Sequence, residues 1–238
     1  REWSVRIPEG DESVPDFSVS VIIPTHRQRP IGLEAFHMQQ GVCEVITLIN
    51  GDIDLEVPGG RRVAWQGHSR TRQAAVSQAK GDFVLFSVDD ALPRGRGCVR
   101  QLVEGLRQGP FDAVTGRQLP WPHSDRFTQD SLANWTPAGN KCLPWHQVDN
   151  VFALYPKELL LKEPFPDVPI AEDLHWSVTH NVGYVPTAPI VHAHDRSPRS
   201  LYRRTRALHV EHCRIGESPR VPTLASLVAA LPAALKTG

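Results

Sequence analysis

The segment that decides the fold runs from Gly81 to Pro93 and reads GDFVLFSVDDALP. An apolar run follows a Gly-Asp turn and ends at two adjacent carboxylates, Asp89 and Asp90. A short apolar run bounded by turn residues predicts a buried strand of a parallel sheet, and open α/β sheets bind their ligands at the carboxyl ends of such strands. We therefore expect a ligand at this turn; for Asp-Asp alone, the alternative is a solvated turn.

Two earlier segments have the same form. Residues 18–25 (SVSVIIPT) are apolar and β-branched and end with Pro-Thr, and residues 44–49 (EVITLI) stop at Asn50-Gly51-Asp52. Helix-length segments separate the three strands, so the pattern is a βαβ alternation. The sequence therefore predicts an α/β domain with a mostly parallel central sheet, flanked by helices, and a site along one edge. A chain of 238 residues is long enough for one such domain.

A helix is predicted for residues 68–79 (HSRTRQAAVSQA), and its beginning carries Arg70 and Arg72. Arginines gain nothing from the helix dipole at this end. A bound anion is therefore one explanation for them, and solvation is the other. The sequence contains no Gly-rich phosphate loop of either common type.

Composition limits the partners and the compartment. The 26 basic and 26 acidic residues balance, which argues against nucleic acid as the main partner. The four cysteines are scattered, without Cys-x-x-Cys spacing, as is typical of reduced thiols in a cytoplasmic protein. We find no membrane-spanning stretch in the sequence. The apolar segment Leu224–Leu235 is expected to pack on the domain or against a second subunit, as in a homodimer, or to contact the inner face of a membrane peripherally.

Five segments occur in a fixed order: SVIIPTHRQRP, CEVITLINGD, HSRTRQAAVSQAKGDFVLFSVDD, AED and VHAHDRS. As an ordered set they resemble the family 2 glycosyltransferases of GT-A fold, over residues 18–206. Residues 114–127 and 149–176 are similar to the bacterial rhamnosyltransferase-like members that build surface polysaccharides.

The resemblance implies a site for a nucleotide diphosphate-sugar. In the family, the loop after the first strand holds the nucleotide base; the matching residues are Pro24, Thr25, His26 and Arg27, followed by Gln28 and Arg29. The second strand of the family commonly ends in an acid, whereas this chain has Asn50, whose amide can both donate and accept and so suits a uracil or thymine edge. The diphosphate or the donor sugar would be contacted by Arg70, Arg117 and Gln118. For the arginines, the alternatives are solvation or pairing with an acid.

The resemblance also implies a divalent metal, Mg2+ or Mn2+. The family's motif is commonly Asp-x-Asp, and its first position here is Val88. Asp90 then remains as the metal ligand and Asp89 as the partner of the ribose. His192 and His194 would share one face of a strand, and either could complete the metal shell. The alternative is that they are surface or hydrogen-bonded histidines. A cation bridging the diphosphate would stabilise the leaving group.

Catalysis is expected from Glu172 and Asp173. In inverting transfer a carboxylate removes the acceptor proton, and the resemblance assigns that role to Asp173, with Glu172 as the second candidate or an acceptor-binding residue. An acid pair that opens a helix can also be a cap. Residues 123–145 are expected to form an irregular loop and an acceptor wall, where sugars stack on aromatic rings. Candidate acceptor-binding residues are Trp121, Trp145 and Trp176.

The sequence thus predicts an inverting hexosyl- or deoxyhexosyltransferase. Its donor would be a UDP-, dTDP- or GDP-sugar, and its acceptor a hydroxyl of a carbohydrate, a lipid-linked sugar or a small molecule, in polysaccharide, glycolipid or secondary-metabolite synthesis. The alternative is a non-catalytic nucleotide-sugar or glycan-binding module of the same fold, because Val88 and Asn50 replace acids. The expected segments are an N-terminal extension (1–17), a nucleotide-sugar half (18–115), an acceptor-binding and catalytic half (116–206) and a helical tail (207–238).

Overall fold

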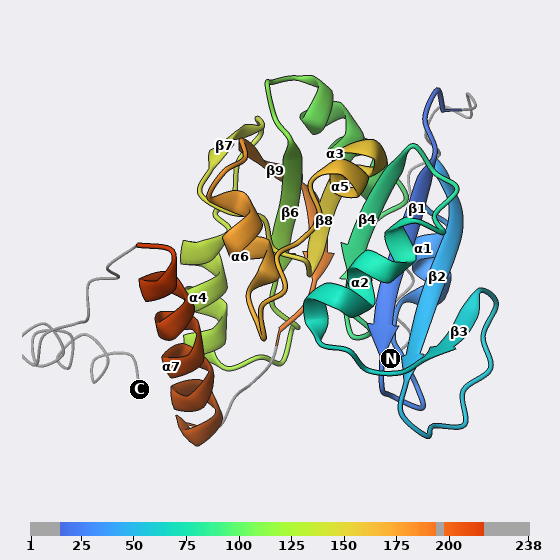
Figure 1. Ribbon diagram of the computed structural model, residues 1–238. Coiled ribbons are helices and arrows are strands. Elements are labelled where there is room, and N and C mark those ends of the chain that lie inside the picture. Colours follow the sequence, from blue (N-terminus) through green and yellow to red (C-terminus); the bar gives the residue numbers. More distant parts are fainter. Residues whose placement is uncertain (1–14, 194–197, 217–238) are drawn as a thin grey trace, which may run out of the picture. The chain divides into compact units, whose positions relative to one another are not determined.

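The computed structural model describes residues 15–193 and 198–216 (Figure 1). The chain divides into two compact units, residues 1–197 and 198–238. Most of the expected N-terminal extension, His194 and residues 217–238 lie outside the described ranges.

The first half of the sheet is parallel, as predicted. Its spatial order is β3-β2-β1-β4, and all three pairings are parallel. The bounds of these strands are Val19–Thr25 for β1, Val42–Asn50 for β2, Gly60–Val63 for β3 and Phe83–Ser87 for β4. Two helices connect them, α1 (Leu33–His37) and α2 (His68–Val76). The helix predicted at residues 68–79 therefore forms and ends three residues early.

The second half of the sheet is mixed. Strand β8 (Phe152–Pro156) is antiparallel to both β4 and β6 (Ala113–Leu119), and β6 is parallel to β9 (Val182–Val191). Two short strands, β5 (Leu92–Pro93) and β7 (Leu143–Trp145), pair with β9 in antiparallel fashion. A single sheet thus joins both halves, and the boundary expected at 115/116 falls inside β6.

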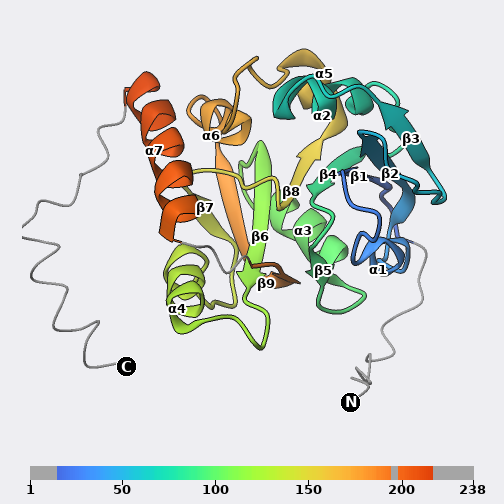
Figure 2. The same cartoon turned by 90° about the horizontal axis from the view of Figure 1, so that it is seen from below.

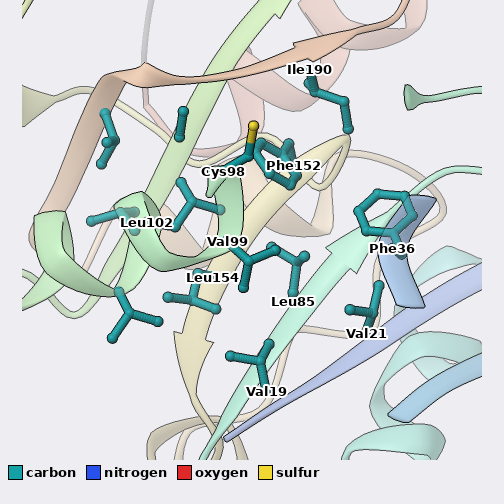
Figure 3. Close-up of a cluster of buried hydrophobic side chains, with 14 of the residues drawn as sticks. Val19, Val21, Phe36, Leu85, Cys98, Val99, Leu102, Phe152, Leu154 and Ile190 are labelled. Carbon is teal, nitrogen blue, oxygen red and sulfur yellow. The ribbon is translucent and has the colours of Figure 1, made fainter. Parts of the chain in front are cut away.

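Helices cover both faces of the sheet (Figure 2). Helices α1 and α3 (Cys98–Arg107) contribute to one apolar cluster, and α2, α5 (Lys157–Lys162) and α6 (Glu172–Ser177) contribute to the other. Figure 3 shows the cluster on the α3 side. Alternate residues of β1 point to opposite clusters, since Val21 and Ile23 belong to the first and Ile22 to the second. A strand buried on both faces explains the continuous apolar runs of the sequence.

The segment at residues 123–145 contains a helix, so our expectation of an irregular loop was wrong there. Helix α4 (Arg126–Trp135) begins after Asp125, whose side chain accepts a hydrogen bond from the backbone N–H of Thr128 at 2.7 Å. This cap stabilises a helix that has no buried residue, and such a helix leaves little apolar periodicity in the sequence.

Helix α7 (Pro198–Arg214) belongs to the second unit, and the boundary expected at 206/207 falls inside it. Within the described ranges, none of the helices combines the length and the apolar character that crossing a bilayer requires.

Candidate active site

The acid pair after β4 is buried and charge-paired. Asp89 and Asp90 are 6% and 8% exposed. Thr25, at the end of β1, donates its hydroxyl to Asp89 Oδ2 at 2.7 Å. Arg27 Nε lies 3.1 Å from Asp89 Oδ1, and its Nη2 lies 2.8 Å from Asp90 Oδ2. One guanidinium therefore bridges both carboxylates, and the ends of β1 and β4 meet as the sequence predicts.

A glycine allows the loop after β1 to approach this turn. Gly32 has a φ of 84°, and a Cβ at this position would lie 2.3 Å from the carbonyl oxygen of Ala91. The neighbouring Ile31 donates its backbone N–H to the carbonyl of Asp89 at 2.7 Å. A larger residue would push the loop away from the acids. Of the other loop residues expected at the donor, Pro24 is half-buried and His26 is exposed.

Asn50 is the last residue of β2, and its side-chain carbonyl oxygen is a buried hydrogen-bond acceptor. Its amide Nδ2 donates to the carbonyl of Leu48 at 3.3 Å and lies 3.5 Å from that of Thr25. Its Oδ1 is buried without a hydrogen-bond partner among the described residues, and the whole residue is 7% exposed. An unsatisfied buried carbonyl is costly, so a donor from a ligand would explain it.

The second half of the chain contributes a histidine to the first acid pair. His192 follows β9, and its Nε2 lies 3.5 Å from Asp90 Oδ1. Its other ring nitrogen, Nδ1, lies 3.2 Å from Oε1 of Gln118 on β6. Gln118 Nε2 in turn donates to Asp149 Oδ2 at 2.7 Å. The structure thus brings His192 and Gln118 to Asp90, and adds Asp149, which we did not predict from the sequence.

Arg117 and Gln118 are separated by the strand that carries them. We expected Arg117 and Gln118 to contact the donor together, but both residues lie within β6, where neighbouring side chains point to opposite faces. The positive charge of Arg117 acts on Tyr184, whose pKa is nevertheless raised to about 12, mainly by burial. Tyr184 stacks on Trp145 with ring centroids 4.7 Å apart. Arg117 therefore lies close enough to Tyr184 for its charge to lower the pKa of that hydroxyl.

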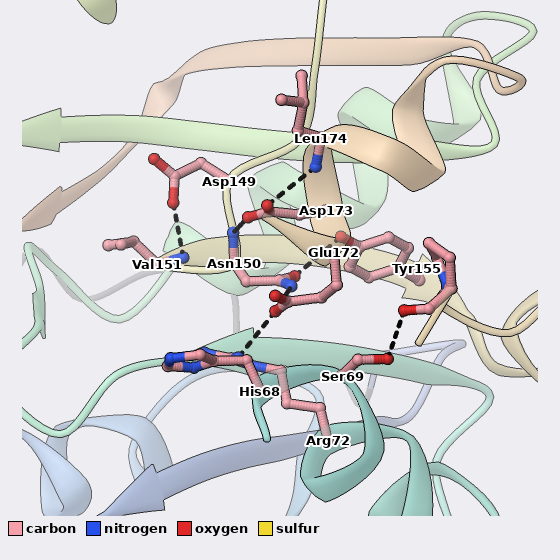
Figure 4. Close-up of polar contacts among 11 residues, drawn as sticks. His68, Ser69, Arg72, Asp149, Asn150, Val151, Tyr155, Glu172, Asp173 and Leu174 are labelled. Carbon is pink, nitrogen blue, oxygen red and sulfur yellow. Dashed lines mark hydrogen bonds and ion pairs between the residues drawn. The ribbon is translucent and has the colours of Figure 1, made fainter. Parts of the chain in front are cut away.

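The second acid pair, Glu172 and Asp173, begins α6, and an ion pair and a hydrogen bond fix the side chain of Glu172. Glu172 is 4% exposed, and its Oε1 lies 2.8 Å from Arg72 Nη1 (Figure 4). Asn150 Nδ2 donates to the same oxygen at 3.0 Å, and the hydroxyl of Tyr155 donates to Asn150 Oδ1 at 2.9 Å. A carboxylate so paired does not suit a general base, the role for which Glu172 was our second candidate after Asp173.

The two arginines at the beginning of α2 lie in different environments. Arg70 has a side chain that is 62% exposed and pairs with Asp167, so it fits the solvated alternative and not an anion site. Arg72 is the buried one, at 7% exposure. The signal was present, because Arg72 follows Ser69 by three residues and precedes Val76 by four, which is the spacing of one helix face.

Asp173 has the environment of a general base. Its Oδ2 accepts a hydrogen bond from the backbone N–H of Asn150 at 3.0 Å. Burial, followed by the negative charges of Glu172 and Asp149, raises the pKa of Asp173 to about 7. The preceding Ala171 has a φ of 61°, the single positive φ of a non-glycine residue in the described ranges. Strained backbone of this kind concentrates at functional sites.

Two consecutive residues before β8 join the acid pairs. The side chain of Asp149 orients Gln118, whereas Asn150 binds Asp173 through its backbone and Glu172 through its amide. The two acid pairs therefore belong to one connected polar site. The sequence signal was an Asp-Asn pair just before an apolar strand, whereas we had weighed acids only after strands and at the start of a helix.

The three candidate tryptophans differ. Trp176 is 3% exposed, donates its indole N–H to the carbonyl of Glu163 at 2.9 Å, and stacks on His180 at a centroid distance of 3.5 Å. It is a core residue, so our assignment of Trp176 to the acceptor wall was wrong: the apolar face of α6 points inward. Trp121 and Trp145 are half-buried and keep part of their surface in solvent.

The donor atoms at Asp90 fit a divalent cation in part. Across the described residues, we find no group of three or more His, Cys, Asp or Glu side chains that could hold a metal ion. Asp90 Oδ1 and His192 Nε2 supply one oxygen and one nitrogen, while the other oxygen of Asp90 contacts Arg27. Mg2+ commonly takes one or two protein ligands and completes its shell with phosphate oxygens and water, so two ligands are compatible with it.

Comparison with known proteins confirms that this is a GT-A glycosyltransferase fold. No protein-family model matches the chain. The O-antigen chain rhamnosyltransferase WbaN of Salmonella anatum is 25% identical over 155 residues, which are 58% of this chain and 49% of that protein. The chain therefore spans about half the length of this curated relative.

Solved structures agree on the fold. The mannosyltransferase PcManGT from Pyrobaculum calidifontis, in complex with GDP-Man and Mn2+, aligns with a TM-score of 0.62 and 20% identity, over 93% of this chain and 76% of its own. S. aureus TarS 1-349, in complex with UDP, aligns with a TM-score of 0.50 and 17% identity, over 82% of this chain and 65% of its own. The predicted α/β fold is therefore confirmed.

Proposed function

We propose that this chain transfers a hexose or deoxyhexose from a nucleotide diphosphate-sugar to a hydroxyl acceptor, with inversion. The observation that carries the proposal is the difference in environment between Glu172 and Asp173, the two acids that begin α6. Arg72 neutralises Glu172, whereas the pKa of Asp173 is raised to about 7. A carboxylate with a pKa near neutrality is suited to taking a proton at that pH.

In this proposal residues 18–115 hold the nucleotide. Asp89 binds the ribose, Arg27 and Thr25 contact the donor from the loop after β1, and the buried Oδ1 of Asn50 accepts a ring N–H of the base. The support from relatives is that one structural neighbour was solved with GDP-Man and Mn2+ and another with UDP. We leave the donor open among UDP-, dTDP- and GDP-sugars.

Asp90 and His192 would hold Mg2+ or Mn2+. The cation, when bound, supplies positive charge that stabilises the departing diphosphate. The protein's own residues supply the rest, since Arg27 lies on the same carboxylates and can turn to the diphosphate oxygens.

Residues 116–206 would hold the acceptor and the base. Asp173 takes the proton of the acceptor hydroxyl while that oxygen forms its bond to the anomeric carbon. The bond from this carbon to the diphosphate breaks on the opposite face, so the configuration inverts. The half-buried rings of Trp121 and Trp145 are the candidate walls for a sugar acceptor. The similarity to an O-antigen chain rhamnosyltransferase supports a carbohydrate acceptor in polysaccharide synthesis. A lipid-linked acceptor, and peripheral contact with the cytoplasmic side of a membrane, are part of the same proposal.

The rival function is a non-catalytic nucleotide-sugar or glycan-binding module. The observation that favours it is Val88, which packs against the apolar core at the position where the family has its first metal-motif acid. The transferase differs from this rival in its use of Asp173, because proton transfer needs a carboxylate of raised pKa and binding alone does not.

Release of nucleoside diphosphate decides between the two functions. A panel of GDP-, UDP- and dTDP-sugars is incubated with the chain, an acceptor mixture and Mn2+ or Mg2+, and the free nucleotide is measured. We expect metal-dependent release from one donor and a loss of about 100-fold or more in Asp90→Asn, whose amide keeps the shape but loses the charge. Donor binding without release, in the wild type and across the panel, would favour the binding module.

A further inference from the structure

We infer that Asp149 and Gln118 are positioning residues that fix the ring tautomer of His192, so that the lone pair of its Nε2 points toward Asp90. This inference deepens the proposed function and rests on it for the use to which the imidazole is put. The tautomer itself follows from hydrogen-bond chemistry alone.

The carboxylate of Asp149 decides how the Gln118 amide is turned. An ionised carboxylate can only accept hydrogen bonds, so the amide atom 2.7 Å from Asp149 Oδ2 must be the nitrogen, Nε2. The amide oxygen Oε1 is then the atom 3.2 Å from His192 Nδ1. Because an amide oxygen only accepts, Nδ1 must carry the proton.

The tautomer of a neutral imidazole follows from that proton. With Nδ1 protonated, Nε2 bears the lone pair, and this atom lies 3.5 Å from Asp90 Oδ1. A nitrogen lone pair beside a carboxylate oxygen is a ready pair of cation ligands. An imidazole that donates its other N–H to a fixed acceptor is the arrangement by which outer residues orient metal-ligating histidines.

Asp149, Gln118 and His192 form a chain of hydrogen bonds that we call the relay, and further hydrogen bonds hold each of the three residues. Gln118 is 6% exposed, and its backbone carbonyl accepts the hydroxyl of Thr136 at 3.0 Å. The second oxygen of Asp149, Oδ1, accepts the backbone N–H of Val151 at 3.0 Å. His192 donates its backbone N–H to the carbonyl of Leu119 at 2.9 Å. The side chains therefore have little freedom to rearrange the pattern.

One isosteric substitution should reverse the direction of the hydrogen bonds that run from Asp149 through Gln118 to His192. In Asp149→Asn the amide oxygen stays with the N–H of Val151, so the new NH2 faces Gln118. The Gln118 amide must then turn, which presents its own NH2 to His192 Nδ1. That nitrogen becomes the acceptor, the proton moves to Nε2, and the lone pair toward Asp90 is lost. The double variant Asp149→Asn/Gln118→Glu restores the original order, because a carboxylate at position 118 accepts from both sides.

The tautomer is measured by 15N NMR of the histidine rings at about pH 8, where an ordinary imidazole is neutral. The His192 signal is assigned by its loss in His192→Gln. We expect an Nδ1–H ring in the wild type and in the double variant, and an Nε2–H ring in Asp149→Asn. A folded Asp149→Asn that keeps the Nδ1–H ring, or a folded double variant that fails to regain it, overturns the inference.

Mn2+ affinity is the second readout, measured by electron paramagnetic resonance without donor or acceptor. We expect binding to weaken about 10- to 100-fold in Asp149→Asn, the usual effect of losing an outer-shell partner, and to recover in the double variant. Glu104→Gln removes one exposed carboxylate on α3 and controls for charge alone. If the wild type binds no Mn2+, the metal part of the proposed function fails, and the NMR result still decides the relay.

Discussion

The two pairs of adjacent acids differ in how an arginine contacts them. At the turn after β4, Arg27 contacts both Asp89 and Asp90. At the start of α6, Arg72 contacts Glu172 alone, and the pKa of the neighbouring Asp173 rises to about 7. The acids of the first pair share one guanidinium, whereas the second pair divides into one acid paired with an arginine and one acid with a raised pKa.

The two arginines also differ in how firmly they are held. The side chain of Arg27 is 41% exposed, and that of Arg72 is 8% exposed. A partly exposed guanidinium can turn to a ligand when another cation replaces it on the buried acids Asp89 and Asp90. A buried guanidinium cannot leave in this way, because its departure strands a charge. The first pair is therefore suited to exchanging ligands and the second to holding a fixed geometry.

The largest effect should come from breaking the buried pair. Arg72→Met removes the guanidinium that pairs with Glu172, a residue that is only 4% exposed. Removing one partner of a buried ion pair costs about 3–5 kcal/mol, so we expect the free energy of unfolding to fall by roughly that amount. Urea denaturation followed by circular dichroism measures it.

Arg70→Met is the matched control, two residues earlier on α2. Its partner Asp167 is exposed, and we expect no measurable change in stability. The double variant Arg72→Met/Glu172→Gln should regain most of the lost stability, since no charge remains unpaired. Equal losses in Arg70→Met and Arg72→Met would contradict a special role for the buried pair.

The contrast between the two pairs also marks the limit of sequence reasoning. The acids after β4 could be predicted because a strand and its turn are local features, and Thr25, Asn50 and Asp89 lie at the strand ends where the pattern places them. The partners of Glu172 could not, because Arg72 is 100 residues away and pairs with it only through packing of α2 near α6. Helix spacing distinguishes Arg72 from Arg70, but it cannot identify Glu172 as the partner, because long-range pairing leaves no local signal.

The next effect tests Asp173 as the proton acceptor. Asp173→Asn should lower the transfer rate about 100-fold or more, the scale for losing a positioned base, while the affinity for nucleoside diphosphate stays within about twofold. The wild-type rate should rise with pH and level off above the pKa of about 7. Stopped assays over a pH series, with binding measured by calorimetry, check both. A variant that loses nucleotide affinity together with rate would place Asp173 in the donor site.

The same substitution has a pH-dependent effect on stability. The pKa of Asp173 is about 7 in the folded chain, above its ordinary value of 3.8, so the folded state binds the proton more tightly. The stability from this group is complete at low pH and is lost as pH rises through 7. Asp173→Asn loses one of the two backbone N–H bonds that the carboxylate oxygens accept, from Asn150 and Leu174, at every pH. We therefore expect the stability difference to shift in favour of the variant as pH rises from 3.8 to about 7, by at least about 1 kcal/mol, since one pKa unit corresponds to about 1.4 kcal/mol. A difference independent of pH would mean that Asp173 is not proton-coupled to folding.

The smallest effect concerns Arg27, whose guanidinium contacts both Asp89 and Asp90. Arg27→Gln removes the guanidinium from Asp89 and Asp90 and leaves both carboxylates more negative. Mn2+ should then bind several-fold more tightly in the absence of nucleotide, because a competing positive charge is gone. Nucleoside diphosphate should bind about 3- to 10-fold more weakly, because a charge-assisted contact is lost. Arg29→Gln, an exposed residue of the same loop, is the control. Opposite shifts of the two affinities in Arg27→Gln alone would identify Arg27 as a cation that leaves its carboxylates for the donor, whereas parallel losses would make it a structural partner like Arg72.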